Sequence, residues 1–212
     1  MIPAGNLLAF SLTALLLVLL PGPSVLFAIG RALSLGRRAA IISVVGNAAG
    51  MYVQVIGVSL GLGVLLQESI VLLTIVKFVG AAFLVYLGIQ AIRHRHDAAK
   101  PVEAVRRGFV RTFLEGSFVG ITNPKTIVFF LAILPQFVAT EAGPVGIQML
   151  LLGGIFVTLC VIFDSLYAIG AGAMRAWFGR SPKRLAGLGT VGGVAMIGLG
   201  VGLAVTGAVE TA

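Results

Sequence analysis

Charged residues are scarce in this chain. Asp, Glu, Lys and Arg make up 10% of its 212 residues, whereas apolar residues make up 58% and the mean hydropathy is +1.10. Soluble domains carry about 25% charged residues. The shortage of charge therefore excludes an ordinary soluble domain and predicts a membrane protein. The net charge of +8 could suggest a nucleic-acid partner, so the positions of the basic residues decide what it means.

Cysteine and histidine are scarce as well. The single Cys160 excludes an intrachain disulfide, a CxxC redox motif and a multi-cysteine metal site, and we interpret it as a small buried hydrophobe. His94 and His96 stand among arginines in a polar segment, where such a pair is far more often surface than a metal ligand. No HExxH motif or Ser/His/Asp constellation is present. We therefore expect no metal, no cofactor and no enzymatic activity.

Six apolar stretches are long enough to cross a membrane. A transmembrane helix takes roughly 20 apolar residues, and an unclosed chain must be helical in lipid because every backbone amide needs an internal partner. The expected spans are residues 6–30, 39–66, 69–92, 112–138, 145–173 and 186–208. The sequence therefore predicts an all-α membrane protein with six transmembrane helices.

The basic residues gather between the first and second, third and fourth, and fifth and sixth spans. Of the 15 Lys and Arg residues, 13 lie there: Arg31, Arg37, Arg38, Arg93, Arg95, Lys100, Arg106, Arg107, Arg111, Arg175, Arg180, Lys183 and Arg184. The positive-inside rule then places both termini outside, in a multi-pass protein of a bacterial-type inner (plasma) membrane. We expect the basic loops to contact anionic lipid headgroups and no nucleic acid.

The long polar segment 93–111 divides the chain into two three-helix repeats, residues 1–92 and 112–212. Because each half has an odd number of spans, the second half must be inverted relative to the first. Two sequence similarities between the halves support a 3+3 inverted repeat. LLPGPSVLFAI matches GITNPKTIVFF, and the spacing of Gly80 and Gly88 recurs in Gly192 and Gly200.

The first span of each half is interrupted by proline. Pro21, Gly22 and Pro23 interrupt one, and Asn123 and Pro124 interrupt the other. A proline inside a helix removes a hydrogen bond and clashes with the carbonyl one turn earlier. Freed backbone groups at membrane depth are tolerated only where they line a cavity or are buried by protein, and transporters place such breaks beside their substrate. A packing kink without a ligand is the alternative.

Two charges are expected deep in spans. Lys125 lies roughly 20 Å beyond Arg111 along a helix, and Asp164 lies roughly 16 Å before Arg175. An uncompensated ion there costs at least about 2.5–3.5 kcal/mol, so both side chains should face the bundle interior. We interpret them as the polar centre of a binding site; a purely structural buried pair is the alternative. Lys77 is close enough to the outer interface to snorkel.

Uncharged polar residues and glycines complete the pattern. Gln54 and Asn47 could donate hydrogen bonds to the site, although hydrogen bonding between helices explains both equally well. Glu115 follows Arg111 by four residues and predicts an ordinary helical ion pair. Small-xxx-small pairs predict close helix packing, and one such face could serve a homodimer. These pairs are Gly46/Gly50, Gly57/Gly61, Gly116/Gly120 and Gly198/Gly202.

Taken in order, LLPGPSVLFAIGRALSLGRRAA, KFVGAAFLVYLGIQAIR and ITNPKTIVFFLAILPQFV resemble the LysE/RhtB family of amino-acid exporters over essentially the whole chain. The resemblance implies export of amino acids or close derivatives from the cytoplasm, driven by the proton gradient, so that the partners are a small-molecule substrate and coupling protons. The residues that match the family's motifs are Pro21, Gly22, Pro23, Asn123, Pro124 and Lys125, with Asp164 in the fifth span.

The resemblance suggests a mechanism. The substrate carboxylate would meet Lys125 and the helix ends exposed by the breaks, and Asp164 would bind the substrate ammonium or the coupling proton. Two other functions fit the sequence: a transporter of another small solute and a non-transporting subunit of a membrane complex. Divalent cations are disfavoured, because their sites need several clustered carboxylates or histidines and only Asp164 lies deep in a span.

Overall fold

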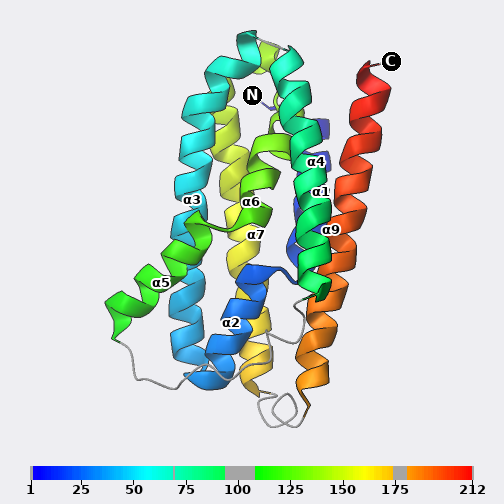
Figure 1. Cartoon of the computed structure of the whole chain (residues 1–212). Coiled ribbons are helices and arrows are strands. Elements are labelled where there is room, and N and C mark those ends of the chain that lie inside the picture. Colours follow the sequence, from blue (N-terminus) through cyan, green and yellow to red (C-terminus); the bar gives the residue numbers. More distant parts are fainter. Residues whose placement is uncertain (1, 69, 94–107, 174–180, 212) are drawn as a thin grey trace.

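The computed structural model describes residues 2–68, 70–93, 108–173 and 181–211, and every regular element in these ranges is a helix. The helices run largely along one axis (Figure 1). The elements are α1 (Ala4–Leu19), α2 (Pro23–Ser34), α3 (Arg37–Glu68), α4 (Ile70–Arg93), α5 (Phe109–Ile121), α6 (Pro124–Val128), the π-helical η2 (Phe129–Ile133), the short 3-10 helices η3 (Leu134–Phe137) and η4 (Thr140–Ala142), α7 (Val145–Ala173) and α9 (Pro182–Thr211). The predicted all-α class is confirmed.

Several of these helices are long and apolar enough to cross a membrane. Residues Arg37–Gly61 of α3 and all of α7 qualify alone. Two bent pairs also qualify: α1 with α2, at an angle of 47°, and α5 with the helical run Pro124–Phe137, at 43°. The described residues thus hold two to four candidate spans. The side chain of Lys77 and the segment that carries His94 and His96 lie outside the described part of the chain.

Both expected helix breaks are present, and in each the proline begins a new helix. α1 ends at Leu19, Leu20 and Gly22 are extended, and Pro23 opens α2. In the second break Asn123 is the N-cap, and its side chain accepts a hydrogen bond from the backbone N–H of Lys125. Proline suits the first helical position because its missing N–H would have no partner there. The expected spans 6–30 and 112–138 are therefore each two helices.

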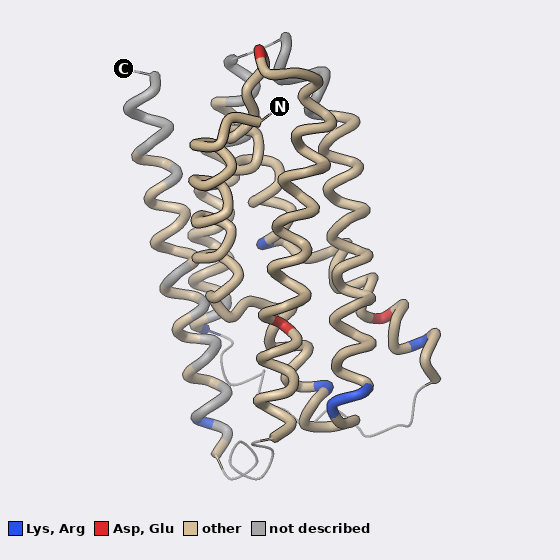
Figure 2. Tube along the Cα trace, turned by 180° about the vertical axis from the view of Figure 1, so that it is seen from behind, with Lys and Arg blue, Asp and Glu red and all other residues tan. Residues whose placement is uncertain are grey.

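The charged residues are unevenly distributed along the bundle. Both termini lie at one end, and the described Lys and Arg residues gather toward the other, with one near mid-height (Figures 1 and 2). Several basic residues expected between the spans lie in helices instead: Arg37 and Arg38 in α3, Arg93 in α4, Arg111 in α5, and Lys183 and Arg184 in α9. Arg31 differs most from the expectation. It lies in α2, which continues to Ser34, and its residue surface is only 5% exposed. It is buried because α5 faces it with a carboxylate, described below.

Glycines bring α3 and α5 into backbone contact. A Cβ on Gly46 would lie 2.2 Å from the carbonyl oxygen of Phe113, and one on Gly50 would lie 2.1 Å from that of Ser117. Gly116 and Gly120 approach α3 as closely. These two small-xxx-small pairs are confirmed as packing within the bundle. For the other two predicted pairs, an added Cβ would meet no described atom of another helix within 4 Å, so this close packing is not seen there: Gly57/Gly61 and Gly198/Gly202.

α4 and α9 pack in the same way. A Cβ on Gly88 would lie 2.4 Å from the carbonyl oxygen of Gly193, and one on Gly200 would lie 2.6 Å from that of Ala81. Gly80 instead faces η2, where its added Cβ would lie 2.8 Å from the Ala132 side chain. α4 and α9 therefore form a tight glycine-mediated pair.

Exchange of Gly50 for valine is expected to destabilise the protein, because no side chain fits between the α3 and α5 backbones. Overpacking of this kind costs about 1–3 kcal/mol. Gly57→Val, one of the glycines with open space around it, is the matched control on the same helix. Thermal unfolding of the purified protein, followed by the reaction of the buried Cys160 thiol, measures the difference. Equal unfolding temperatures for the two variants would show that the close approach contributes nothing.

Candidate functional site

The two helix breaks meet at the centre of the bundle through Lys125. Its ammonium group donates hydrogen bonds of 2.7 Å to the carbonyl oxygens of Leu17 and Leu20, at the end of α1. Lys125 is buried, with 6% of its surface exposed. A Cβ on Gly22 would lie 2.9 Å from Lys125 Cδ, so the glycine leaves room for this side chain. The lysine of the second break thus satisfies carbonyls freed by the first.

Three other carbonyls at the breaks are also capped from the opposite half of the chain. The Tyr167 hydroxyl on α7 donates 2.8 Å to the carbonyl of Leu19. At the second break, Gln54 Nε2 on α3 donates to the carbonyls of Gly120 and Ile121, at 2.8 and 2.7 Å. Each break therefore depends on a side chain of the other half for its hydrogen bonds, which ties the two halves together at this depth.

Gln54 also fixes the start of α6, because its Oε1 accepts a 2.9 Å hydrogen bond from the Thr126 hydroxyl. Asn123 Nδ2 donates to Ser24 Oγ, which joins the first turns of α6 and α2. Ser24 and Thr126 were not identified from the sequence. A signal for Ser24 was present, since it follows Pro23 as Lys125 follows Pro124.

Lys125 and Asp164 line one small central cavity of about 20 Å³. Asp164 is buried, with 3% of its surface exposed, so both charges face the bundle interior as expected. The ion pairs seen among the described residues are those of Arg31 and Arg111 with Glu115; none joins Lys125 to Asp164. The cavity holds about one water. Its lining residues are Val18, Gly22, Ser24, Val25, Met51, Asn123, Lys125, Thr126, Phe156, Cys160 and Asp164.

Other predicted site residues act at a distance from this cavity. Pro21, Pro23 and Pro124 shape the backbone and do not line it. Asn47 is buried where α3 packs on α5, with its carbonyl oxygen 2.2 Å from a Cβ placed on Gly120. The structure therefore brings together Gly22, Asn123, Lys125 and Asp164, with Gln54 bound to the adjacent break, and it leaves Asn47 at the helix interface. Within the described ranges no three His, Cys, Asp or Glu residues are grouped to hold a metal.

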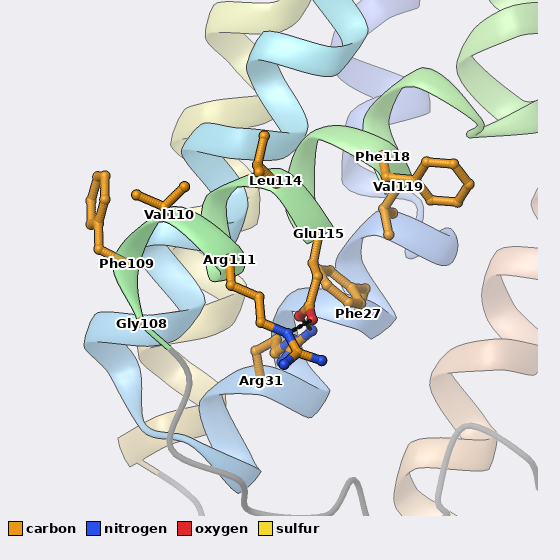
Figure 3. Close-up of a pocket in the computed structure, with 10 residues that line it drawn as sticks. All are labelled: Phe27, Arg31, Gly108, Phe109, Val110, Arg111, Leu114, Glu115, Phe118 and Val119. Atoms are coloured by element: carbon orange, nitrogen blue, oxygen red, sulfur yellow. Dashed lines mark hydrogen bonds and ion pairs between the residues drawn. The ribbon is translucent and has the colours of Figure 1, made fainter.

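A second and much larger space lies between α2 and α5 (Figure 3). This cleft has a volume of about 890 Å³. The Glu115 carboxylate lies at its wall and pairs with Arg31 of α2 and, at 3.1 Å, with Arg111 of α5. The i,i+4 pair of Arg111 with Glu115 confirms the sequence prediction. The pair between helices was not foreseen, because it depends on the bend between α1 and α2.

Comparison with known proteins adds the family. The sequence profile of the LysE type translocator family matches residues 15–207. The chain belongs to this family. Its transmembrane character and its role as a transporter, not an enzyme, follow from that membership and agree with the apolar helices. The resemblance identified from the PGP and NPK motifs is confirmed.

Curated relatives cover most of the chain. The homoserine/homoserine lactone efflux protein of Salmonella typhimurium is 33% identical over 180 residues, 85% of this chain and 86% of its own length. An uncharacterized membrane protein of Vibrio cholerae is 32% identical over 202 residues, 93% and 95% of the two chains. A Bacillus subtilis membrane protein is 26% identical over 205 residues, 92% and 97% of the two chains. No solved structure matches significantly.

Proposed function

We propose that this protein is an inner-membrane secondary transporter that exports neutral amino acids or close derivatives from the cytoplasm, with homoserine as the first candidate. Family membership and the efflux relative support export of an amino-acid-like solute. The observation that carries the assignment of the site is the meeting of two broken helices through Lys125, beside the buried Asp164. Interrupted helices at mid-membrane are where secondary transporters bind substrate.

The proposed topology has six spans in a 3+3 inverted repeat, residues 1–92 and 112–212, joined by the basic segment 93–111, with both termini outside. Three observations support it. Each half begins with a bent pair of helices, and each break is capped from the other half. Both termini lie at the end of the bundle opposite most described Lys and Arg residues (Figure 2). α4 and α9 would supply the third and sixth spans.

In the proposed mechanism the solute binds between the breaks. Lys125 uses two of its three ammonium protons on the α1 carbonyls, so one is left for a substrate carboxylate. The N-terminus of α2 lies at the same cavity and favours negative charge. Asp164 binds the substrate ammonium or the coupling proton. Because the cavity holds only about one water, a solute must separate the halves, and rocking of one half against the other gives alternating access.

Efflux from preloaded cells tests the function. Cells that express the protein and cells with an empty vector are loaded with labelled homoserine, homoserine lactone, threonine, leucine or lysine, and release is followed with and without an uncoupler. We expect homoserine or another neutral amino acid to leave faster from the expressing cells, and the uncoupler to stop the difference. If none moves although the protein is in the membrane, the export assignment fails, and transport of another solute or a subunit role takes its place.

A further inference from the structure

The cleft between α2 and α5 has the size and position of a solute-binding site. Its volume of about 890 Å³ lies within the roughly 300–1,000 Å³ of small-molecule sites, whereas the central cavity of about 20 Å³ is closed to any amino acid. It is lined by α5 from Gly108 to Val119. The next residue, Gly120, has its carbonyl bound by Gln54 at the second break. The cleft therefore extends from the basic end of the bundle to the level of the central site.

Opposite charges meet at the wall of this cleft. Arg31 is almost fully buried in α2 and pairs with Glu115 Oε2 on α5, and its guanidinium lies 4.8 Å from the centre of the Phe27 ring. Its Nη1 is buried and has no hydrogen-bond partner among the described residues. A buried ion pair gains little stability unless its remaining donors are satisfied. A guanidinium group that has an N–H donor without a partner and lies at the wall of a cleft is instead suited to bind the carboxylate of a ligand.

We propose that the α2–α5 cleft is a cytoplasmic binding site for the zwitterionic head group of a neutral amino acid, in which Arg31 binds the carboxylate and Glu115 binds the ammonium. The inference rests on the proposed function and adds an earlier site on the same transport path. The incoming head group replaces the Arg31–Glu115 ion pair, so the buried Arg31 and the half-buried Glu115 each keep a partner of opposite sign. Arg111 keeps its contact with the other oxygen, Glu115 Oε1.

The rest of the cleft selects for an uncharged side chain. Apart from Arg31, Arg111 and Glu115, its lining is glycine and apolar residues: Phe27, Gly108, Phe109, Val110, Leu114, Phe118 and Val119. Among the described residues no second carboxylate lines it, so a lysine or arginine side chain would lose hydration without gaining a partner there. An anionic lipid headgroup fits less well than a zwitterion, because Glu115 would repel its phosphate.

Everted membrane vesicles expose this cleft to the medium and test the proposal directly. Uptake of labelled homoserine is measured in competition with homoserine lactone, which lacks the free carboxylate, and N-acetylhomoserine, which lacks the ammonium. In Arg31→Gln we expect KM for homoserine to rise about tenfold or more, while Ki for the lactone stays within about twofold. In Glu115→Gln the same pattern is expected with N-acetylhomoserine as the analogue whose Ki is unchanged. Arg31→Gln should thus no longer distinguish homoserine from the analogue without a carboxylate, and Glu115→Gln should no longer distinguish it from the analogue without an ammonium.

Controls separate head-group binding from a structural ion pair. Lys183→Gln, at an exposed position near the start of α9 and outside the cleft, is expected to leave KM within about twofold. Arg31→Lys keeps the charge without the fork and should give an intermediate KM, which keeps the test usable if Arg31→Gln does not fold. The charge-swapped double variant Arg31→Glu with Glu115→Arg should not restore KM, because the two binding positions are exchanged.

Several results would overturn the inference. The ion pair would be purely structural if a variant raised KM for homoserine and Ki for both analogues by the same factor. The same conclusion would follow if the charge-swapped double variant restored the wild-type KM. If Arg31→Gln raised KM only in proteoliposomes with anionic lipid, and the ratio of KM for homoserine to Ki for the analogues did not change, the cleft would be assigned to a lipid phosphate. Wild-type vesicles that take up none of the amino acids would overturn the proposed function as well, whereas normal uptake with unaltered ratios in the variants would overturn this inference alone.

Discussion

Exchange of Lys125 for methionine is expected to reduce amino-acid export to the background of empty-vector cells. The variant keeps the length of the side chain but removes the only described cation at the central cavity, together with both hydrogen bonds to the α1 carbonyls. Loss of one partner from a buried charged contact costs about 2–5 kcal/mol, so transport should fall about 30-fold or more. Efflux of labelled homoserine, normalised to the amount of protein in the membrane, is the measurement.

Two controls distinguish this loss from unfolding. Lys183→Met, at an exposed position near the start of α9, should transport normally. Tyr167→Phe removes the hydrogen bond to Leu19 at the same break but does not change the cavity lining, so it should lower the unfolding temperature and keep measurable export. A Lys125→Met protein that is inserted and still exports at more than about a third of the wild-type rate would remove Lys125 from the site.

Asp164→Asn is expected to abolish uphill export with little change in packing, since asparagine is nearly isosteric and the side chain is buried. The lost charge is either the partner of the substrate ammonium or the carrier of the coupling proton. Counterflow separates the two roles, because exchange of labelled for unlabelled homoserine across proteoliposomes needs substrate binding but no net proton movement. If Asp164 binds the ammonium, export and exchange are both lost; if it carries the proton, exchange survives.

Glu141→Gln, at an exposed carboxylate in η4, is the matched control and should behave like the wild type. Uphill export by Asp164→Asn at the wild-type rate would contradict both roles. Asp164 would then be a structural residue of α7, the alternative already present in the sequence interpretation.

The helix breaks could be predicted because their cause is local. A proline inside a helix removes a hydrogen bond and clashes with the carbonyl one turn earlier, so Pro23 and Pro124 indicated the positions at which α2 and α6 begin. Burial of Lys125 and Asp164 was equally predictable. Lys125 lies too near mid-membrane, and the Asp164 side chain is too short, to reach the membrane surface, so both must face the bundle interior. These inferences needed only the residue type and its depth along one span.

The partners of these groups could not be predicted, because they come from distant parts of the chain. Lys125 was expected to serve a ligand and also caps carbonyls about 105 residues earlier, at Leu17 and Leu20. Arg31 was counted with the basic loops because its partner Glu115 lies on the other half. Which helix face meets which is decided by the bends of 47° and 43°, and a proline motif indicates that a bend occurs but not its direction.

Binding of homoserine to the purified protein, measured by isothermal titration calorimetry for the wild type, Lys125→Met and Asp164→Asn, is the most direct test of a substrate site between the two breaks. The account predicts binding by the wild type and none by Lys125→Met, in protein that unfolds cooperatively. Asp164→Asn is predicted to lose binding if the carboxylate holds the ammonium and to retain it if the carboxylate carries the proton. Undiminished binding by folded Lys125→Met would contradict the account and place the substrate elsewhere in the bundle.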